Sequence, residues 1–284
     1  MTETTGTNDA ATTTSNRPEP GHWLLARLGK RVLRPGGIEL TKWLLGRVAV
    51  GAGDHVVELG PGVGRTAELL LTAGPERYVG IEPNPAAREV LRPILRRHPS
   101  IELIDADASD TGLPAAGATV VVGEALLTMQ SPDRKRAIVA EAFRLLRPGG
   151  RYAIHEMSLQ PHDLSDDARK QLVNDLGQSI KVGAQPLTVP GWRALLEESG
   201  FEILEVDEAP MRLLETSRLV RDEGVVGTAR FVTNLLRDAQ ARERVLAMRA
   251  AFRAHADELA AVAIVARRPL VLSDDTLENL EIRS

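Results

Sequence analysis

The stretch Val56-Val57-Glu58-Leu59-Gly60-Pro61-Gly62-Val63-Gly64 decides the fold of this chain. It predicts a short buried strand that ends in a glycine turn, and the residues that follow predict a helix over 65–72. Glycine has no Cβ and tolerates positive φ, so a ligand can approach the backbone of such a turn closely. The first N–H groups of the next helix then face a polar or anionic part of that ligand. The sequence therefore predicts a nucleotide-type cofactor site near its N-terminus.

The spacing of the glycines indicates which cofactor is bound. Counted from Gly60, the dinucleotide fingerprint G-x-G-x-x-G requires a glycine at position 65, where this chain has Arg65. The third glycine is Gly64, one residue early. The G-x-G-x-G spacing, after a strand that ends in an acidic residue, resembles motif I of the class I S-adenosylmethionine (SAM) methyltransferases. An NAD-dependent dehydrogenase is disfavoured for the same reason.

Later segments continue the resemblance in the family order. The apolar run 78–81 ends at Glu82, about 20 residues beyond the glycine turn, where a ribose diol is usually bound. The run 101–106 leads to Asp107-Ala108 and then to a Leu-Pro turn, which resembles motif III. A fourth strand over 119–122 ends at Gly123-Glu124. The residues LLRPGGRYAIHE, 145–156, resemble the helix end, Pro-Gly-Gly turn and fifth strand of the superfamily.

The resemblance covers residues 56–157 and points to the type 11 subgroup, which includes the ubiquinone and menaquinone C-methyltransferases. It implies an α/β fold: a Rossmann-like, seven-stranded methyltransferase sheet with helices on both faces. It also implies SAM as cofactor and S-adenosylhomocysteine (SAH) as product. In this family Glu58 would hold the methionine ammonium, Glu82 the ribose diol and Asp107 with Ala108 the adenine, with Asp105 as a rival to Asp107. The implied cofactor-binding positions are Glu58, Gly60, Pro61, Gly62, Gly64, Glu82, Pro83, Asp107, Ala108 and Glu124.

Three side chains at strand ends are candidates for catalysis: Glu124, His155 and Glu156. Methyl transfer needs alignment, exclusion of water and, for some acceptors, removal of a proton. Alternation along a strand puts His155 and Glu156 on opposite faces, so we expect one to face the pocket while the other packs. Histidine is the better base near neutral pH. Structural roles stay open for both, and no spacing implies metal ligands.

Composition excludes several other classes of function. The chain has 284 residues, of which 43% are hydrophobic and 26% charged, as in an ordinary soluble domain. A net charge of −4 and an aromatic content of 3% argue against nucleic acid as a partner. The absence of cysteine excludes disulfides, a thiol nucleophile and arsenic binding through thiolates. With neither a signal peptide nor a membrane-spanning run in view, we expect a cytoplasmic protein without stable membrane insertion.

The rest of the chain indicates how the core is elaborated. Ligands of open α/β sheets bind beyond the carboxyl ends of the parallel strands, so helices inserted after the sixth strand should form a cap over a substrate pocket. The alternative is a dimer face, which leaves a homodimer open. Arg34 is expected to be a solvated charge at a helix end. The expected units are a disordered tail (1–20), N-terminal helices (21–50), a SAM-binding core (51–157), a helical linker or lid (158–190), a core helix with strand six (191–209), a helical cap insertion (210–259), strand seven (260–269) and a C-terminal tail (270–284).

These patterns favour a SAM-dependent methyltransferase that acts on an O, N or activated C atom of a small molecule. One alternative is a non-catalytic protein that binds SAM or a partner through the same fold, because fold does not fix function. The NAD-dependent dehydrogenase is the less favoured alternative. The identity of the acceptor depends on the half of the chain that resembles the family least.

Overall fold

The computed structural model describes residues 19–96, 101–181, 183–211 and 213–270, so most of both expected tails lies outside the described residues. The helices are α1 (Gly21–Arg27), α2 (Gly37–Val48), α3 (Arg65–Thr72), α4 (Pro85–Leu95), the short 3-10 helix η1 (Leu127–Met129), α5 (Pro132–Leu145), α6 (Asp166–Ile180), α7 (Val189–Glu198), α8 (Thr216–Arg237) and α9 (Ala239–Ala254). The strands are β1 (His55–Leu59), β2 (Arg77–Ile81), β3 (Ile101–Ile104), β4 (Ala118–Glu124), β5 (Leu146–Leu159), β6 (Leu187–Thr188), β7 (Glu202–Pro210) and β8 (Leu259–Arg267).

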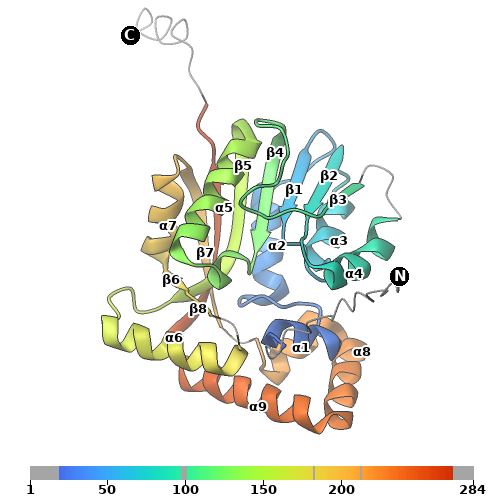
Figure 1. Ribbon diagram of the computed structural model, residues 1–284, viewed down its shortest axis with the longest axis vertical. Helices are drawn as coiled ribbons and strands as arrows, with labels where there is room; N and C mark the ends of the chain where they lie inside the picture. The colour runs from blue at the N-terminus through green and yellow to red at the C-terminus, as the bar shows by residue number, and fades with distance from the viewer. Residues whose placement is uncertain (1–18, 97–100, 182, 212, 271–284) are drawn as a thin grey trace, which may run out of the picture.

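One mixed sheet organises the chain, in the order β3-β2-β1-β4-β5-β8-β7 (Figure 1). Strands β1 to β5 are parallel to one another, whereas β8 runs antiparallel to β5 and β7. The Rossmann-like α/β prediction is confirmed. The sheet has eight strands rather than the expected seven, because the two-residue β6 pairs with the end of β5 through Ser158 and Leu159.

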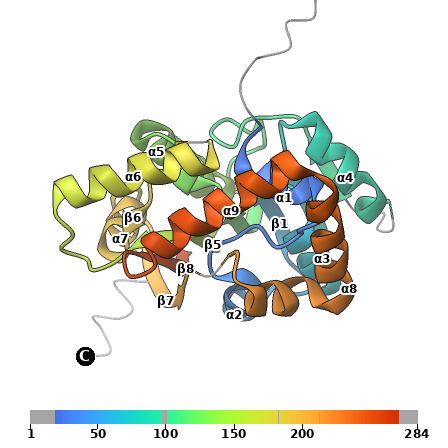
Figure 2. The same cartoon turned by 90° about the horizontal axis from the view of Figure 1, so that it is seen from below.

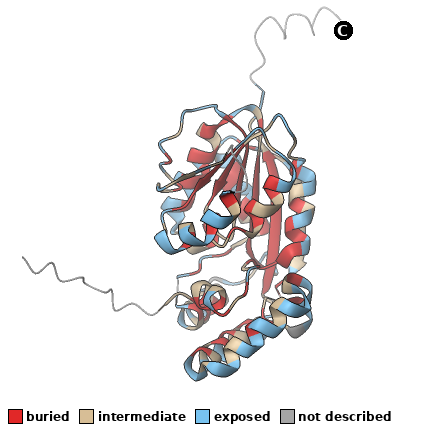
Figure 3. Ribbon diagram, turned by 90° about the vertical axis from the view of Figure 1, so that its right-hand side faces the viewer, coloured by how far each residue is buried: buried red, intermediate tan, exposed pale blue. Residues whose placement is uncertain are grey.

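Alternating side chains bury both faces of the sheet, as Figure 3 shows. Val57 of β1 belongs to a core cluster shared with helices α5 and α7, which supply Ile138 and Trp192. Its neighbour Val56 belongs to a second cluster shared with helices α2, α3 and α4, which supply residues such as Leu44. The near-continuous apolar strands are what a parallel sheet covered on both faces requires.

The remaining helices form a third layer at one end of the sheet (Figures 1 and 2). Helices α1, α6, α8 and α9 share a hydrophobic cluster with the last residues of β5, Met157 and Leu159, and with the start of β8. The expected cap therefore lies at the carboxyl ends of the parallel strands. Helix α8 is interrupted at Gly224, which has φ 71° and ψ 174°. Its two parts correspond to separate helices that the sequence predicts near 215–223 and 226–236.

The segment between α1 and α2 ties this cap to the core. The sequence predicts that the first of the N-terminal helices extends over 22–33. In the structure it stops at Arg27, and Gly29 follows with φ 102°. Beyond it, the Glu223 carboxylate of α8 accepts the backbone N–H groups of Arg31 and Val32 at 2.9 and 2.8 Å. Lys30 also reaches Asp222 and Glu223, so four charged or polar contacts hold this segment against α8.

The glycine turn between β1 and α3 is shaped by close packing at its last residue. Gly64 is the N-cap of α3 with φ 79°. A Cβ added there would lie 2.6 Å from Ile94 Cδ1 and 2.7 Å from Leu91 Cδ2 of α4. Only glycine meets both constraints, since other residues would be strained in φ and would displace core side chains.

We expect Gly64→Ala to lower the free energy of unfolding by about 1–3 kcal/mol, because positive φ and overpacking both oppose it. The matched control is Gly46→Ala on the exposed face of α2, where an added Cβ meets no atom within 4 Å. That change should stabilise the protein by about 0.5–1 kcal/mol, because alanine is the better helix former. Urea denaturation measures both. Equal effects of the two substitutions would contradict the packing described at Gly64.

Candidate functional site

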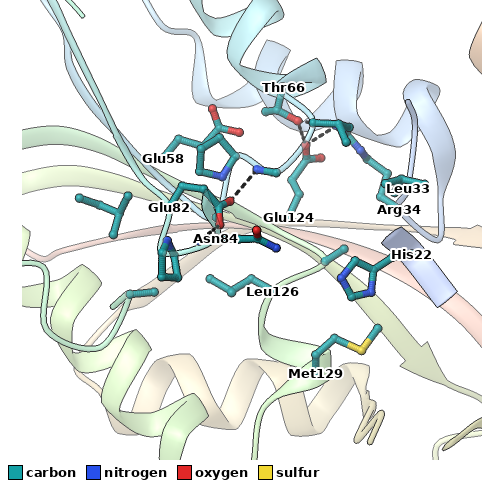
Figure 4. A pocket seen from close by; sticks show the side chains of 18 of the residues that line it. His22, Leu33, Arg34, Glu58, Thr66, Glu82, Asn84, Glu124, Leu126 and Met129 are labelled. Carbon is teal, nitrogen blue, oxygen red and sulfur yellow. Dashed lines mark hydrogen bonds and ion pairs between the residues drawn. The ribbon is translucent and has the colours of Figure 1, made fainter. Parts of the chain in front are cut away.

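A cavity of about 340 Å³ lies where β1, β2 and β4 end beneath the N-terminal segment. Figure 4 shows Glu58 and Glu82 toward one side of it, with His22 and Met129 toward the other. Of the positions predicted to bind cofactor, all except Gly64 line the cavity: Glu58, Gly60, Pro61, Gly62, Glu82, Pro83, Asp107, Ala108 and Glu124. The structure therefore brings together residues that are up to 66 positions apart because their strands end at one edge.

Glu58 is buried at this edge of the sheet. The residue is 3% exposed, and Tyr78 Oη donates a hydrogen bond of 2.6 Å to Glu58 Oε2. Burial raises the pKa of Glu58 to about 8, although the Tyr78 hydrogen bond acts in the opposite direction. The carboxyl is therefore largely protonated at neutral pH until a cation approaches it.

Glu82 links the end of β2 to the glycine turn. Its Oε2 accepts the N–H of Gly62 at 3.0 Å and its Oε1 accepts the N–H of Asn84 at 2.9 Å. Burial raises the pKa of Glu82, while these two backbone hydrogen bonds lower it in part. A carboxylate has about four lone-pair positions, so both oxygens can still accept from two hydroxyl groups of a ligand.

Asp107 is the most exposed of the acidic residues in the cavity. Its Oδ1 accepts hydrogen bonds from the backbone N–H and the hydroxyl of Ser109, at 2.8 and 2.6 Å. Its Oδ2 forms an ion pair with Arg134, whose side chain is 48% exposed. A half-exposed pair of this kind contributes about 0–1 kcal/mol, so a ligand amino group can replace Arg134 at small cost. The rival Asp105 is outside the cavity lining and pairs with Arg88.

Glu124 ends β4 at the centre of a buried polar network. Its Oε1 accepts from Thr41 at 2.7 Å and meets His155 Nδ1 at 2.9 Å, and its Oε2 contacts Thr66 and Arg34. Burial raises the pKa of Glu124, but the charge of Arg34 and the hydrogen bonds of His155 and Thr66 outweigh it and lower the pKa to about 2. Glu124 is therefore a fixed anion with four partners. That geometry disfavours the predicted role as a base.

His155 does not face the cavity, contrary to one of the catalytic hypotheses. Its imidazole is fully buried, and Nε2 accepts the N–H of Gly36 at 3.1 Å. Nδ1 then carries the proton and donates to Glu124. Burial lowers the pKa of His155, opposed by Glu124. Both nitrogens are occupied, so the imidazole has no lone pair to offer a substrate.

Glu156 lies on the other face of β5, as alternation requires, and it also has a structural environment. Its carboxylate accepts the N–H groups of Leu126, Leu127 and Thr128 at 2.8–3.0 Å, and the hydroxyl of Thr128 at 2.6 Å. Burial raises the pKa of Glu156, and these hydrogen bonds oppose the rise. The side chain thus caps helix η1 and is absent from the described cavity lining. The geometry disfavours it as a base.

Several residues of the site were missed or misjudged from the sequence. Arg34, expected to be solvated, is 6% exposed and pairs with Glu124. Thr41 and Thr66 belong to no sequence motif. Their role as hydrogen-bond donors to Glu124 follows only from contacts across the fold. His22 was expected only to begin a helix, yet it lines the cavity beside Met129 (Figure 4). One sequence signal could have identified His22 as a site residue. It lies near the start of a segment that packs over the strand ends.

The backbone of the glycine turn leaves room for a ligand. Gly60 and Gly62 have φ of 69° and 55°. A Cβ on Gly60 would meet nothing nearer than Leu126 Cδ1 at 3.5 Å, and one on Gly62 nothing nearer than Gly60 O at 3.9 Å. A cationic ligand with a diol fits this open backbone and the carboxyl groups of Glu58 and Glu82. In the described part of the chain, no group of three or more His, Cys, Asp or Glu could hold a metal ion.

Comparison with known proteins agrees with this geometry. The sequence profile of a family described as a methyltransferase domain matches residues 56–150. The chain is 30% identical over 231 residues to an uncharacterized protein of Haemophilus influenzae, across 80% of this chain and 90% of that protein. It is 30% identical to 27-O-demethylrifamycin SV methyltransferase of Amycolatopsis mediterranei, across 57% of this chain and 59% of the relative. Phosphoethanolamine N-methyltransferase 2 of Haemonchus contortus, solved in complex with SAM, superposes with a TM-score of 0.64 at 15% identity, across 88% of this chain and 57% of that chain.

The fold and the cavity define a nucleotide-cofactor protein, with the site where the strand order reverses between β1 and β4. Residues 56–150 form a methyltransferase domain of the class I SAM-dependent kind, and SAM is the cofactor of this family. Its assignment to the type 11 subgroup stays a prediction. Among the residues that the structure describes, no helix is long and apolar enough to cross a membrane.

The environment of Glu156 leads to a prediction that separates a structural role from a catalytic one. Glu156→Gln places an amide NH2 against backbone N–H donors, so we expect a loss of about 2–4 kcal/mol and a Tm lower by about 5–10 °C. Glu198→Gln, at an exposed position of α7, is the matched control and should leave Tm unchanged. Thermal unfolding by circular dichroism measures both. An unchanged Tm for Glu156→Gln would contradict the capping role.

Proposed function

We propose that this protein transfers a methyl group from SAM to an oxygen, nitrogen or activated carbon atom of a small molecule. The observation that carries the proposal is the arrangement of Glu82 against the glycine turn. Its carboxylate is held by Gly62 and Asn84 with acceptor positions left for a ribose diol. The Amycolatopsis relative is a 27-O-demethylrifamycin SV methyltransferase, which supports the same class of acceptor.

The side chains of the cavity divide the work of binding. Glu58 holds the methionine ammonium, Glu82 the ribose hydroxyls, and Asp107 with the N–H of Ala108 the adenine. Gly60 and Gly62 provide a backbone surface without Cβ atoms. The cofactor supplies a methyl group activated by a sulfonium. Glu124 acts indirectly, since its network fixes Arg34 and α3 beside the glycine turn.

The dehydrogenase alternative loses support, and an experiment separates the other alternative from the enzyme. A dehydrogenase that binds NAD would need a third glycine at position 65, where α3 begins with Arg65. A non-catalytic SAM-binding protein would share the cavity but would need no acceptor site. Turnover of SAM in the presence of a metabolite extract separates the enzyme from the binder.

The first prediction of this proposal concerns Glu82. Glu82→Ala removes two charged hydrogen bonds to ribose, so we expect the affinity for SAM and SAH to fall about 10- to 100-fold. Isothermal titration calorimetry measures this, with NADH as a ligand that should give no response. Glu89→Ala, an exposed carboxylate of α4, is the matched control for the change in charge and should bind normally. Binding of NADH alone would overturn the proposal.

The second prediction follows from the pKa of Glu58. Because that pKa is about 8 without ligand, an ammonium beside the carboxyl should lower it and release close to one proton at pH 7. Proton release means that affinity for SAM rises with pH between about 6 and 8, by up to about tenfold per unit. Calorimetry at pH 7 in two buffers of different ionisation enthalpy counts the proton. Glu58→Gln should release none, and a wild-type protein that also releases none would refute the assigned contact.

A further inference from the structure

A second cavity, of about 50 Å³, lies on the cap side of the cofactor cavity. We call it the methionine chamber, because four of its lining residues are Met129, Met157, Met211 and Met248. These are all the methionines of the chain except Met1. They come from four places in the fold: helix η1, strand β5, the segment after β7 and helix α9. Leucines, isoleucine and Phe252 complete most of the lining.

The chamber and the cofactor cavity share a boundary. His22, Leu33, Ala125 and Met129 line both spaces, and we call these four residues the neck. In Figure 4 His22 and Met129 lie beside each other, at a distance from Glu82 across the cavity. A molecule in the chamber would therefore extend through the neck toward the cofactor.

Polar groups are scarce around the chamber. Among the described lining residues, only His22 and Thr128 have polar side chains. The Thr128 hydroxyl donates to Glu156 and accepts the N–H of Met157, so it is occupied. The imidazole of His22 makes no hydrogen bond to another residue in the described part of the chain, and its ring centroid lies 5.3 Å from that of Trp23. Its imidazole is thus the polar group available at the neck.

The apolar lining of the chamber determines which chemical groups can occupy it. A charged or strongly polar group placed there would lose its hydration without gaining hydrogen bonds, at a cost of several kcal/mol. An apolar body would instead gain from leaving water. Methionine side chains are unbranched and polarisable, so they adjust to ligands of different shape. The small volume of the chamber can therefore widen without moving the backbone.

We propose that the methionine chamber binds the apolar body of the methyl acceptor, and that His22 accepts the proton of the acceptor's hydroxyl or amine at the neck. This inference rests on the proposed function. In the transfer, the acceptor oxygen or nitrogen bonds to the methyl carbon while the carbon–sulfur bond breaks with its electron pair on sulfur. The proton of the acceptor passes to an imidazole nitrogen of His22.

The surroundings of His22 suit this role. Burial lowers its pKa, so the imidazole is neutral at physiological pH and has a lone pair. General-base groups of this kind contribute about 10²–10⁴-fold to a rate. His22 thus replaces the sequence-based candidates, whose lone pairs are occupied within the core.

The methionines allow a direct test in the full chain. With ε-13C-methyl methionine and saturating SAH, the NMR spectrum should contain four chamber signals and that of Met1. Phenol and toluene should both shift the four chamber signals and leave Met1 in place. Only phenol should shift the ring signals of His22, since toluene lacks the hydroxyl. Dimethylglycine, a charged amine, is the polar probe and should shift none of them.

Substitutions test whether the probes bind at the chamber and at His22. Met248→Gln should weaken phenol binding at least tenfold, whereas Leu246→Gln, at a 53% exposed position of the same helix, should not change it. His22→Phe should abolish the difference between phenol and toluene. Met248→Gln, whose position lines only the chamber, should keep the SAH affinity of the wild type.

The outcomes separate the two proposals. If SAH binds but neither aromatic probe shifts the chamber signals, the chamber proposal is wrong and the methyltransferase proposal stands. If dimethylglycine shifts them as phenol does, the apolar acceptor class is wrong. If SAH itself does not bind, the proposed function fails first. Equal shifts of His22 with phenol and toluene would remove His22 as the proton acceptor.

Discussion

The geometry of the site depends on the ion pair and hydrogen bonds of the buried Glu124 carboxylate. It ends β4 and is held by Arg34 from the N-terminal segment, Thr41 of α2, Thr66 of α3 and His155 of β5. A buried charge with partners on this many elements is costly to disturb, since loss of one partner typically removes about 3–5 kcal/mol. The network therefore fixes one wall of the cavity, to which Arg34, Thr66 and Glu124 contribute.

A second set of buried charges positions the cap itself. Lys30 is fully buried, with Nζ 3.4 Å from Asp222 Oδ2 and 3.5 Å from Glu223 Oε1 of α8. Asp222 also accepts the N–H of Ile38 at 3.0 Å, at the start of α2. These contacts adjoin the break in α8 at Gly224. Buried ion pairs thus hold one side of the site, and the flexible methionine side chains of the chamber line the other. The rigid side suits a cofactor that is always the same, and the flexible side suits the acceptor.

The cofactor half could be predicted from sequence because its determinants are local. Helix α3 has the predicted bounds, since the glycine turn and the apolar spacing define both its ends. Glu58, Glu82 and Asp107 meet because parallel strands end at one edge, which follows from topology alone. The roles of His155 and Glu156 could not be predicted in this way. Their partners are the N–H of Gly36, 119 positions away, and the backbone of η1, so only the folded chain shows that both are occupied.

The same reasoning explains the errors over Arg34 and the acceptor site. A charged residue at the start of an Arg-Pro-Gly-Gly segment favours a solvated position unless a distant carboxylate accepts it, and Glu124 is 90 positions away. The methionine chamber combines residues from the two ends of the described chain, so no local sequence pattern predicts it. The central claim is that cofactor and acceptor meet at the neck. A crystal structure with SAH and phenol tests it most directly: the account predicts ribose against Glu82 and the phenol hydroxyl between the sulfur and His22. SAH bound elsewhere, or phenol outside the chamber, would contradict it.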